Sequence, residues 1–167
     1  LHDSVLQSMH AIQAEPDEPD QVAYIARRQE RELRKTIRTL QSEFDAPFVG
    51  AMFAARDDVE DLYRVRVEMV CGYDAEMTAT LGVLVEATRE AMINAAKHSG
   101  SDLIRVHCSE TNGHISVLVR DEGSGFDTDT VVPKSIRRRL EAISGTATFQ
   151  STDEFGTEVE MTVLKEM

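Results

Sequence analysis

The chain opens with two stretches whose apolar residues recur at helical spacing. Residues 1 to about 14 form an otherwise polar segment, and its apolar stripe consists of Leu1, Val5, Met9 and Ile12. Residues 15–20 hold two prolines and four acids, which predicts a turn. A second helix is expected from about residue 21 to residue 42, because its apolar positions follow a loose heptad among charged side chains.

A hairpin of two such helices is too narrow to bury its own apolar stripe. We therefore expect a homodimer, in which two copies of residues 1–42 form a four-helix bundle around a shared core. The alternative is a hairpin that folds back on its own domain. Residues 43–61 show no clear period and are interpreted as a connector, so residues 62–167 would form the second domain.

The second domain is predicted to begin with a strand and a long helix. Apolar residues alternate over 65–69, and Gly72 ends the predicted strand. A helix is expected over about residues 75–99, with Gly100 placed to cap its C-terminus. One face of this helix carries five apolar residues and a threonine: Leu81, Leu84, Val85, Thr88, Met92 and Ala95.

Further alternation predicts four more strands. The first two are joined by the hairpin signal Glu110-Thr111-Asn112-Gly113, and a basic helix separates them from the last two. In chain order, these strands and the helix are expected at 103–108, 114–120, 135–143, 147–151 and 157–163. The order β-α-β-β-α-β-β after two helices predicts an α+β fold, a sandwich with helices on one face of a mixed sheet.

Composition excludes several classes of protein. The formal net charge of -12 argues against a non-specific grip on nucleic acid or on an anionic membrane surface. The two cysteines, Cys71 and Cys108, provide neither a disulfide framework nor a zinc spacing, and we interpret them as reduced, buried thiols. No apolar run is long enough to span a bilayer, so we expect a cytoplasmic location, with any membrane anchor in regions absent from this chain.

A polar stripe on the long helix carries the side chains of a magnesium and phosphate site. Glu90, Asn94 and Lys97 sit four and then three residues apart, so they are expected to project to one side. Carboxylate and amide oxygens are hard ligands that suit Mg²⁺, and an ammonium group suits phosphate. Taken alone, this spacing also fits an exposed helical ion pair.

A loop with two glycines follows the strand at 114–120. It is Asp121-Glu122-Gly123-Ser124-Gly125-Phe126-Asp127, in which the glycines let the backbone pass close to a ligand. A dinucleotide fingerprint would need a third glycine, and a phosphate-binding P-loop would need a Gly-Lys-Ser/Thr ending. Taken alone, the loop is therefore an ordinary turn.

The order and spacing of these elements resemble the ATP-binding domain of histidine kinases. Its fold, the GHKL or Bergerat fold, is shared with gyrase-type ATPases, heat-shock chaperones and mismatch-repair proteins. The resemblance runs from about Arg64 to the end of the chain. It is carried by Glu90, Asn94, Lys97, His98, Asp121, Gly123, Gly125 and the pair Gly156-Thr157.

The resemblance implies a phosphate end of a nucleotide site on the long helix. There, Asn94 would be the Mg²⁺ ligand, Lys97 and His98 would contact the phosphates, and Glu90 would orient a metal-bound water. One segment departs from the family, because residues 131–137 contain no glycine where a second glycine-rich box is common. The lid would then be short, and the phosphates could meet the N-terminus of the helix that begins near residue 135.

The resemblance also implies an adenine end. Asp121 would accept a hydrogen bond from the adenine amino group. Gly123 and Gly125 would let the backbone reach the base, and Thr157 would support it through a hydroxyl or a water.

The first residues resemble a phosphoacceptor box. Leu1-His2-Asp3-Ser4-Val5-Leu6-Gln7 is similar to the box of the nitrate-sensor and desaturase-regulator class of histidine kinases. The resemblance implies that His2 takes the phosphoryl group, that Asp3 orients its ring and accepts its second proton, and that Gln7 positions water against an aspartyl phosphate.

The implied protein is an ATP- and Mg²⁺-dependent kinase. It would autophosphorylate His2, pass the phosphoryl group to the receiver domain of a response regulator, and act as a phosphatase through Gln7. A catalytically silent dimeric nucleotide-binding scaffold is an alternative, since the second glycine box is missing. A serine kinase of the anti-sigma type shares the ATP domain but has no phosphoacceptor hairpin, so residues 2–7 argue against it.

Overall fold

The computed structural model describes residues 47–123, 133–152 and 156–165. The predicted helical hairpin at 1–42, its dimer and the box with His2, Asp3 and Gln7 lie outside the described residues, as does Gly125. The elements are α3 (Pro47–Tyr63), β1 (Arg66–Cys71), α4 (Ala79–His98), β2 (Leu103–Thr111), β3 (His114–Asp121), α5 (Lys134–Glu141), β4 (Thr146–Thr152) and β5 (Gly156–Leu164).

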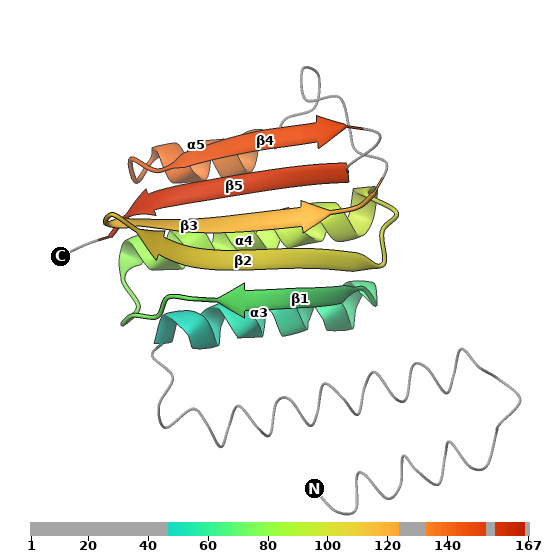
Figure 1. The fold of residues 1–167 in the computed structure, drawn as a ribbon, viewed down its shortest axis with the longest axis horizontal. Helices are drawn as coiled ribbons and strands as arrows, with labels where there is room; N and C mark the ends of the chain where they lie inside the picture. Colours follow the sequence, from blue (N-terminus) through green and yellow to red (C-terminus); the bar gives the residue numbers. More distant parts are fainter. Residues whose placement is uncertain (1–46, 124–132, 153–155, 166–167) are drawn as a thin grey trace, which may run out of the picture. The chain divides into compact units, whose positions relative to one another are not determined.

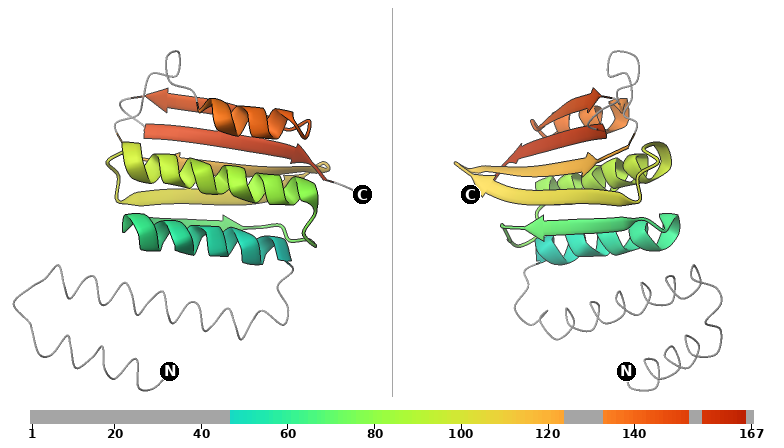
Figure 2. Two further views of the ribbon diagram at one scale, coloured as in Figure 1. Left: turned by 180° about the vertical axis from the view of Figure 1, so that it is seen from behind. Right: turned by 45° about the vertical axis from the view of Figure 1, so that its right-hand side comes forward.

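The strands form one mixed sheet in the order β1-β2-β3-β5-β4. β1 runs parallel to β2, with α4 as the crossover between them, and the other neighbouring strands are antiparallel. The three described helices cover the same face of this sheet (Figures 1 and 2). The predicted α+β domain with a mixed sheet is therefore confirmed in the described part of the chain.

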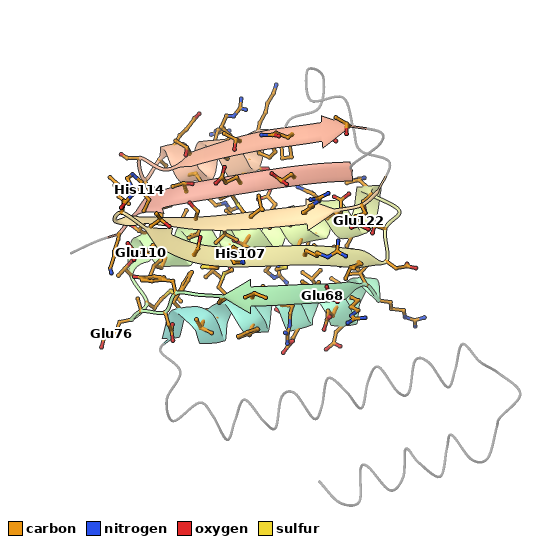
Figure 3. The ribbon with its side chains drawn as sticks, in the orientation of Figure 1. Glu68, Glu76, His107, Glu110, His114 and Glu122 are labelled. Carbon is orange, nitrogen blue, oxygen red and sulfur yellow. The ribbon has the colours of Figure 1, made fainter. Side chains whose placement is uncertain are left out.

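The open face of the sheet is polar. His107 on β2 is exposed there, as its alternation with the buried Val106 predicts, and Figure 3 shows it beside the neighbouring strands. Arg105 forms ion pairs on this face with Glu68 and Glu122. None of the helices α3, α4 and α5 is both long and apolar enough to cross a membrane.

α4 forms where its periodicity predicts, although it starts four residues later. The Thr78 hydroxyl caps it by accepting a hydrogen bond from the Leu81 N–H at 3.2 Å. Past the C-cap Ser99, Gly100 adopts a φ of 71°, which glycine tolerates best. All six residues of the predicted apolar face are buried: Leu81, Leu84, Val85, Thr88, Met92 and Ala95.

α3 corrects the expectation that residues 43–61 connect two domains. It is a 17-residue helix whose stripe packs into the core and consists of Phe48, Met52, Ala55 and Val59. The helix was missed because two charged residues, Arg56 and Glu60, are also buried, which weakens the apolar period. The domain therefore begins before residue 62.

Glu60 is buried against β1, where its carboxylate accepts a backbone hydrogen bond. The N–H of Arg66 points inward and donates to the Asp102 carbonyl, whereas the N–H of Val67 donates to Oε1 of Glu60 at 2.7 Å. An edge strand otherwise presents unpaired N–H groups. The carboxylate of α3 thus satisfies a donor of β1 that no strand in the described sheet reaches.

Asp121, at the end of β3, continues the alternation of inward-facing residues along this strand. Ile115, Val117 and Val119 are buried, and Asp121 follows them in phase with only 3% of its surface exposed. A β-carbon at Gly123 would lie 2.1 Å from the Ser99 carbonyl oxygen. Glycine is therefore needed where the chain leaving β3 crosses the C-terminus of α4.

The substitution Gly123→Ala should lower the free energy of unfolding by about 1–3 kcal/mol or more, because the added methyl overlaps backbone that cannot move freely. Urea unfolding followed by circular dichroism measures this change.

Gly82→Ala is the matched control. Gly82 lies in α4, and a β-carbon there would meet nothing within 4 Å. This variant should gain about 0.5–1 kcal/mol, since alanine is the better helix former. Equal effects of the two substitutions would contradict the close packing assigned to Gly123.

Candidate functional site

A cavity of about 400 Å³ lies between α4, α5 and the core face of the sheet. This volume falls within the roughly 300–1,000 Å³ typical of small-molecule sites. Its polar lining consists of Glu90, Asn94, His98, Ser99, Asp121, Ser135 and Thr157. Its remaining walls are Ala91, Ala95, Val119, Pro133, Ile136 and Val159.

Asn94 and Asp121 line this single cavity from different elements. Asn94 comes from α4 and is half-buried, whereas Asp121 ends β3. They meet because α4 packs across the sheet, behind β3 in Figure 1. Thr157, near the start of β5, and His98, at the end of α4, line the same cavity. Glu90 lines it as well, so the tertiary structure gathers five of the residues singled out from the sequence.

Asp121 is held in place by two backbone N–H groups. Its Oδ1 accepts hydrogen bonds from Gly123 N at 2.9 Å and from Thr157 N at 3.3 Å. Gly156 permits this approach, because its φ is 75° and a β-carbon there would lie 2.2 Å from the Asp121 carbonyl oxygen. Among the described residues only Oδ1 is engaged, so Oδ2 is available to a ligand.

Burial raises the pKa of the Asp121 carboxyl group, while the hydrogen bonds from Gly123 and Thr157 oppose this shift. A carboxyl group with a raised pKa favours its protonated form in the folded state. The Asp121 carboxyl group therefore stabilises the folded state at pH values below its unfolded pKa of about 3.9. This stabilisation is lost as pH rises through the folded pKa. The folded protein thus holds a desolvated carboxyl group, an arrangement frequent at binding sites.

Gly123 lies outside the lining of the cavity. The sequence suggested that it lets the backbone reach a base, but it is not among the residues that line the cavity. Its close packing against Ser99 instead fixes the exit of β3, and its N–H holds Asp121. Gly123 thus acts on the cavity through Asp121.

Lys97 also departs from expectation, because it does not line the cavity. Its exposed side chain turns toward α3, with Nζ 5.7 Å from the centroid of the Tyr63 ring. The spacing predicts that Glu90, Asn94 and Lys97 project to one side of α4. In the structure only Glu90 and Asn94 line the cavity. The sequence pattern does not predict α3, which ends at Tyr63, so it does not predict this contact either.

Glu90 joins α4 to α5 at the rim of the cavity. Its Oε1 accepts a hydrogen bond from the Ser135 hydroxyl, and its Oε2 lies 3.2 Å from Nη2 of Arg139. The ion pair is partly exposed, so by itself it contributes roughly 0–1 kcal/mol. The sequence did not identify Ser135 or Arg139 as site residues. Only the packing of α5, through Ile136 and Leu140, shows which arginine of the basic run faces Glu90.

The described residues provide few metal ligands of their own. No group of three or more His, Cys, Asp or Glu side chains among them is placed to hold a metal ion. A divalent cation in the cavity would rely on the amide oxygen of Asn94 and on oxygens brought by a ligand or water. Such a site suits Mg²⁺ bound together with phosphates.

The sequence is similar to curated sensor proteins. No protein-family profile matches the chain. It is 30% identical to the nitrate/nitrite sensor protein NarQ of Escherichia coli (strain K12) over an alignment of 144 residues. This match covers 79% of this chain and 24% of that protein. It is 34% identical to the sensor histidine kinase YdfH of Bacillus subtilis (strain 168) over 82 residues, which are 44% of this chain and 20% of that protein. The chain thus spans about a quarter or less of the length of these relatives.

The fold is similar to solved histidine kinase domains. The histidine kinase domain of the blue-light activated histidine kinase from Erythrobacter litoralis EL346 matches 71% of this chain and 61% of its own, with a TM-score of 0.62 and 16% identity. The ATP binding domain of PrrB from Mycobacterium tuberculosis matches 71% of this chain and 93% of its own, with a TM-score of 0.62 and 17% identity. This chain is therefore a relative of the sensor histidine kinases, and its described residues have the fold of a histidine kinase ATP-binding domain.

Proposed function

We propose that this chain is the transmitter part of a two-component sensor histidine kinase, which binds ATP with Mg²⁺ and transfers the γ-phosphoryl group to His2. The observation that carries the proposal is the single cavity lined by Asn94 and Asp121. The similarity to sensor histidine kinases supports it, because the aligned part of NarQ covers 79% of this chain.

Asp121 would recognise the adenine base. Its Oδ2, which no other described residue engages, would accept a hydrogen bond from the exocyclic amino group, while Oδ1 stays on the backbone N–H groups of Gly123 and Thr157. Val119 and Val159 line the cavity with apolar surface suited to the faces of the base. A buried acceptor of this kind selects strongly for ligands that carry the matching donor.

Asn94 and His98 would face the triphosphate from α4. The amide oxygen of Asn94 is a hard ligand that fits Mg²⁺, and the bound ion would neutralise phosphate charge. Ser135, in the first turn of α5, adds a hydroxyl and the favourable end of a helix. The role proposed for Glu90, orienting a metal-bound water, requires its carboxylate to leave Ser135 and Arg139.

His2 would be the nucleophile, in a homodimer formed by residues 1–42. A neutral imidazole attacks phosphorus without further activation near pH 7, and Asp3 would take the proton that the ring releases. Positioning and charge neutralisation account for most of phosphoryl transfer. The phosphoryl group would then pass to an aspartate of a response regulator on the cytoplasmic side of the membrane, and Gln7 would support its hydrolysis there.

The substitution Asp121→Asn separates recognition from folding. The amide oxygen can still accept from Gly123 and Thr157, but the NH₂ group now opposes the adenine amino group. ATP affinity, measured by calorimetric titration with Mg²⁺, should fall about tenfold or more. The free energy of unfolding at pH 7.5 should stay equal or rise, because the desolvated carboxylate is gone.

Asp102→Asn, at an exposed position before β2, is the matched control and should change neither quantity. Loss of stability together with loss of binding in Asp121→Asn would contradict the role assigned to this carboxylate.

Incubation with labelled ATP and Mg²⁺ tests the phosphoacceptor. Acid-labile, alkali-stable label should appear on the wild-type chain and be absent from His2→Ala, while His10→Ala, changed within the same segment, keeps it. Gln7→Ala should also keep the label but slow dephosphorylation of the regulator.

Label that persists on His2→Ala would refute the assignment of His2. Tight ATP binding without any label in a longer chain would favour the silent scaffold.

A further inference from the structure

The two cysteines of the chain are direct neighbours on adjacent strands. Cys71 ends β1, and in the parallel pairing of β1 with β2 its register partner is Cys108. The register is held beyond the strand end, because Gly72 N donates to the Cys108 carbonyl at 2.8 Å. Neighbouring strands lie roughly 4.7–4.9 Å apart, within the roughly 4.4–6.8 Å between Cα atoms that disulfides span.

Both thiols lie on the helix-covered face of the sheet. Cys108 follows Ile104 and Val106 in phase and is fully buried, at 0% exposure. Cys71 is only partly buried and is followed by the exposed Gly72. Cys71 is therefore the more accessible of the two cysteines in the folded protein.

The thiols also differ in acidity. The hydrogen bond from the Cys108 thiol lowers the pKa of Cys71, and the Arg56 guanidinium acts in the same direction, against burial and Asp74. The same hydrogen bond and burial raise the pKa of Cys108. Because the thiolate is the nucleophile, Cys71 is the first thiol expected to react.

We propose that Cys71 and Cys108 form a dithiol that reacts reversibly with low-molecular-weight disulfides, with Cys71 as the attacking and Cys108 as the resolving residue. The Cys71 thiolate attacks one sulfur of a disulfide RSSR, so the S–S bond breaks and RS⁻ leaves. The Cys108 sulfur then gives up its proton and attacks Sγ of Cys71, which expels the second RS⁻. Two protein thiols are oxidised to one disulfide, and RSSR is reduced to two RSH that retain the two protons.

The disulfide would tie β1, at the edge of the described sheet, to its neighbour β2. Among the described residues that line the cavity, none belongs to β1 or β2. The dithiol is therefore a second reactive site, away from the proposed nucleotide site and independent of the proposed kinase function.

Oxidised glutathione tests the proposal on the folded chain, which holds no other cysteine. After acid quench and alkylation in denaturant, the intact mass should show a protein that has lost two hydrogens and carries neither glutathione nor alkyl groups. Dithiothreitol should restore two alkylatable thiols. A wild-type protein that keeps glutathione as a stable adduct, or that resists oxidation until it is unfolded, would overturn the proposal.

Two variants separate the roles of the thiols. In Cys108→Ala, glutathione should remain on Cys71, because no resolving thiol is left. In Cys71→Ala, Cys108 should stay unmodified until urea unfolds the chain.

Peptide mapping of wild-type protein, quenched early in the reaction, gives a readout free of any folding defect in the variants. The first adduct should map to Cys71, and an adduct found first on Cys108 would overturn the assignment.

Discussion

The buried carboxylate of Asp121 is the constraint on which the site depends. It is on the core face of β3 because it continues the inward alternation of Ile115, Val117 and Val119. Two close backbone approaches, at Gly123 and at Gly156, bring donors to one of its oxygens, and no described residue engages the other. Burial of this carboxyl group disfavours its charged form, an arrangement frequent at functional sites.

The rim of the cavity is determined by how α3 and α5 pack against α4. α5 is anchored by Ile136 and Leu140, and this places its hydroxyl and guanidinium on the carboxylate of Glu90. α3, on the other side of α4, attracts Lys97 to the ring of Tyr63. The polar side chains of α4 therefore divide between two neighbouring helices. Lys97 lies toward α3, whereas Glu90, Asn94 and His98 line the cavity.

The domain separates the cavity from the two cysteines along the sheet. The antiparallel strands β3 and β5 line the cavity, whereas the two cysteines lie on the parallel pair β1 and β2. The parallel register at the edge is supported by α3, whose Glu60 accepts from the outward N–H of Val67. α3, which the sequence pattern does not predict, thus stabilises the strand that carries Cys71.

Local pattern was sufficient for the strands and for the buried face of α4. The resemblance carried by the ordered motifs added five residues that line the cavity, which are Glu90, Asn94, His98, Asp121 and Thr157. Alternation and helical period predict which face is buried because backbone geometry sets them residue by residue. The pattern was insufficient for α3, for the contacts of Lys97 and Arg139, and for the pairing of Cys71 with Cys108. A buried carboxylate such as Glu60, the direction of a long side chain and the register of a parallel pair all depend on groups distant in sequence. Only the packing of helices on the sheet brings those groups together.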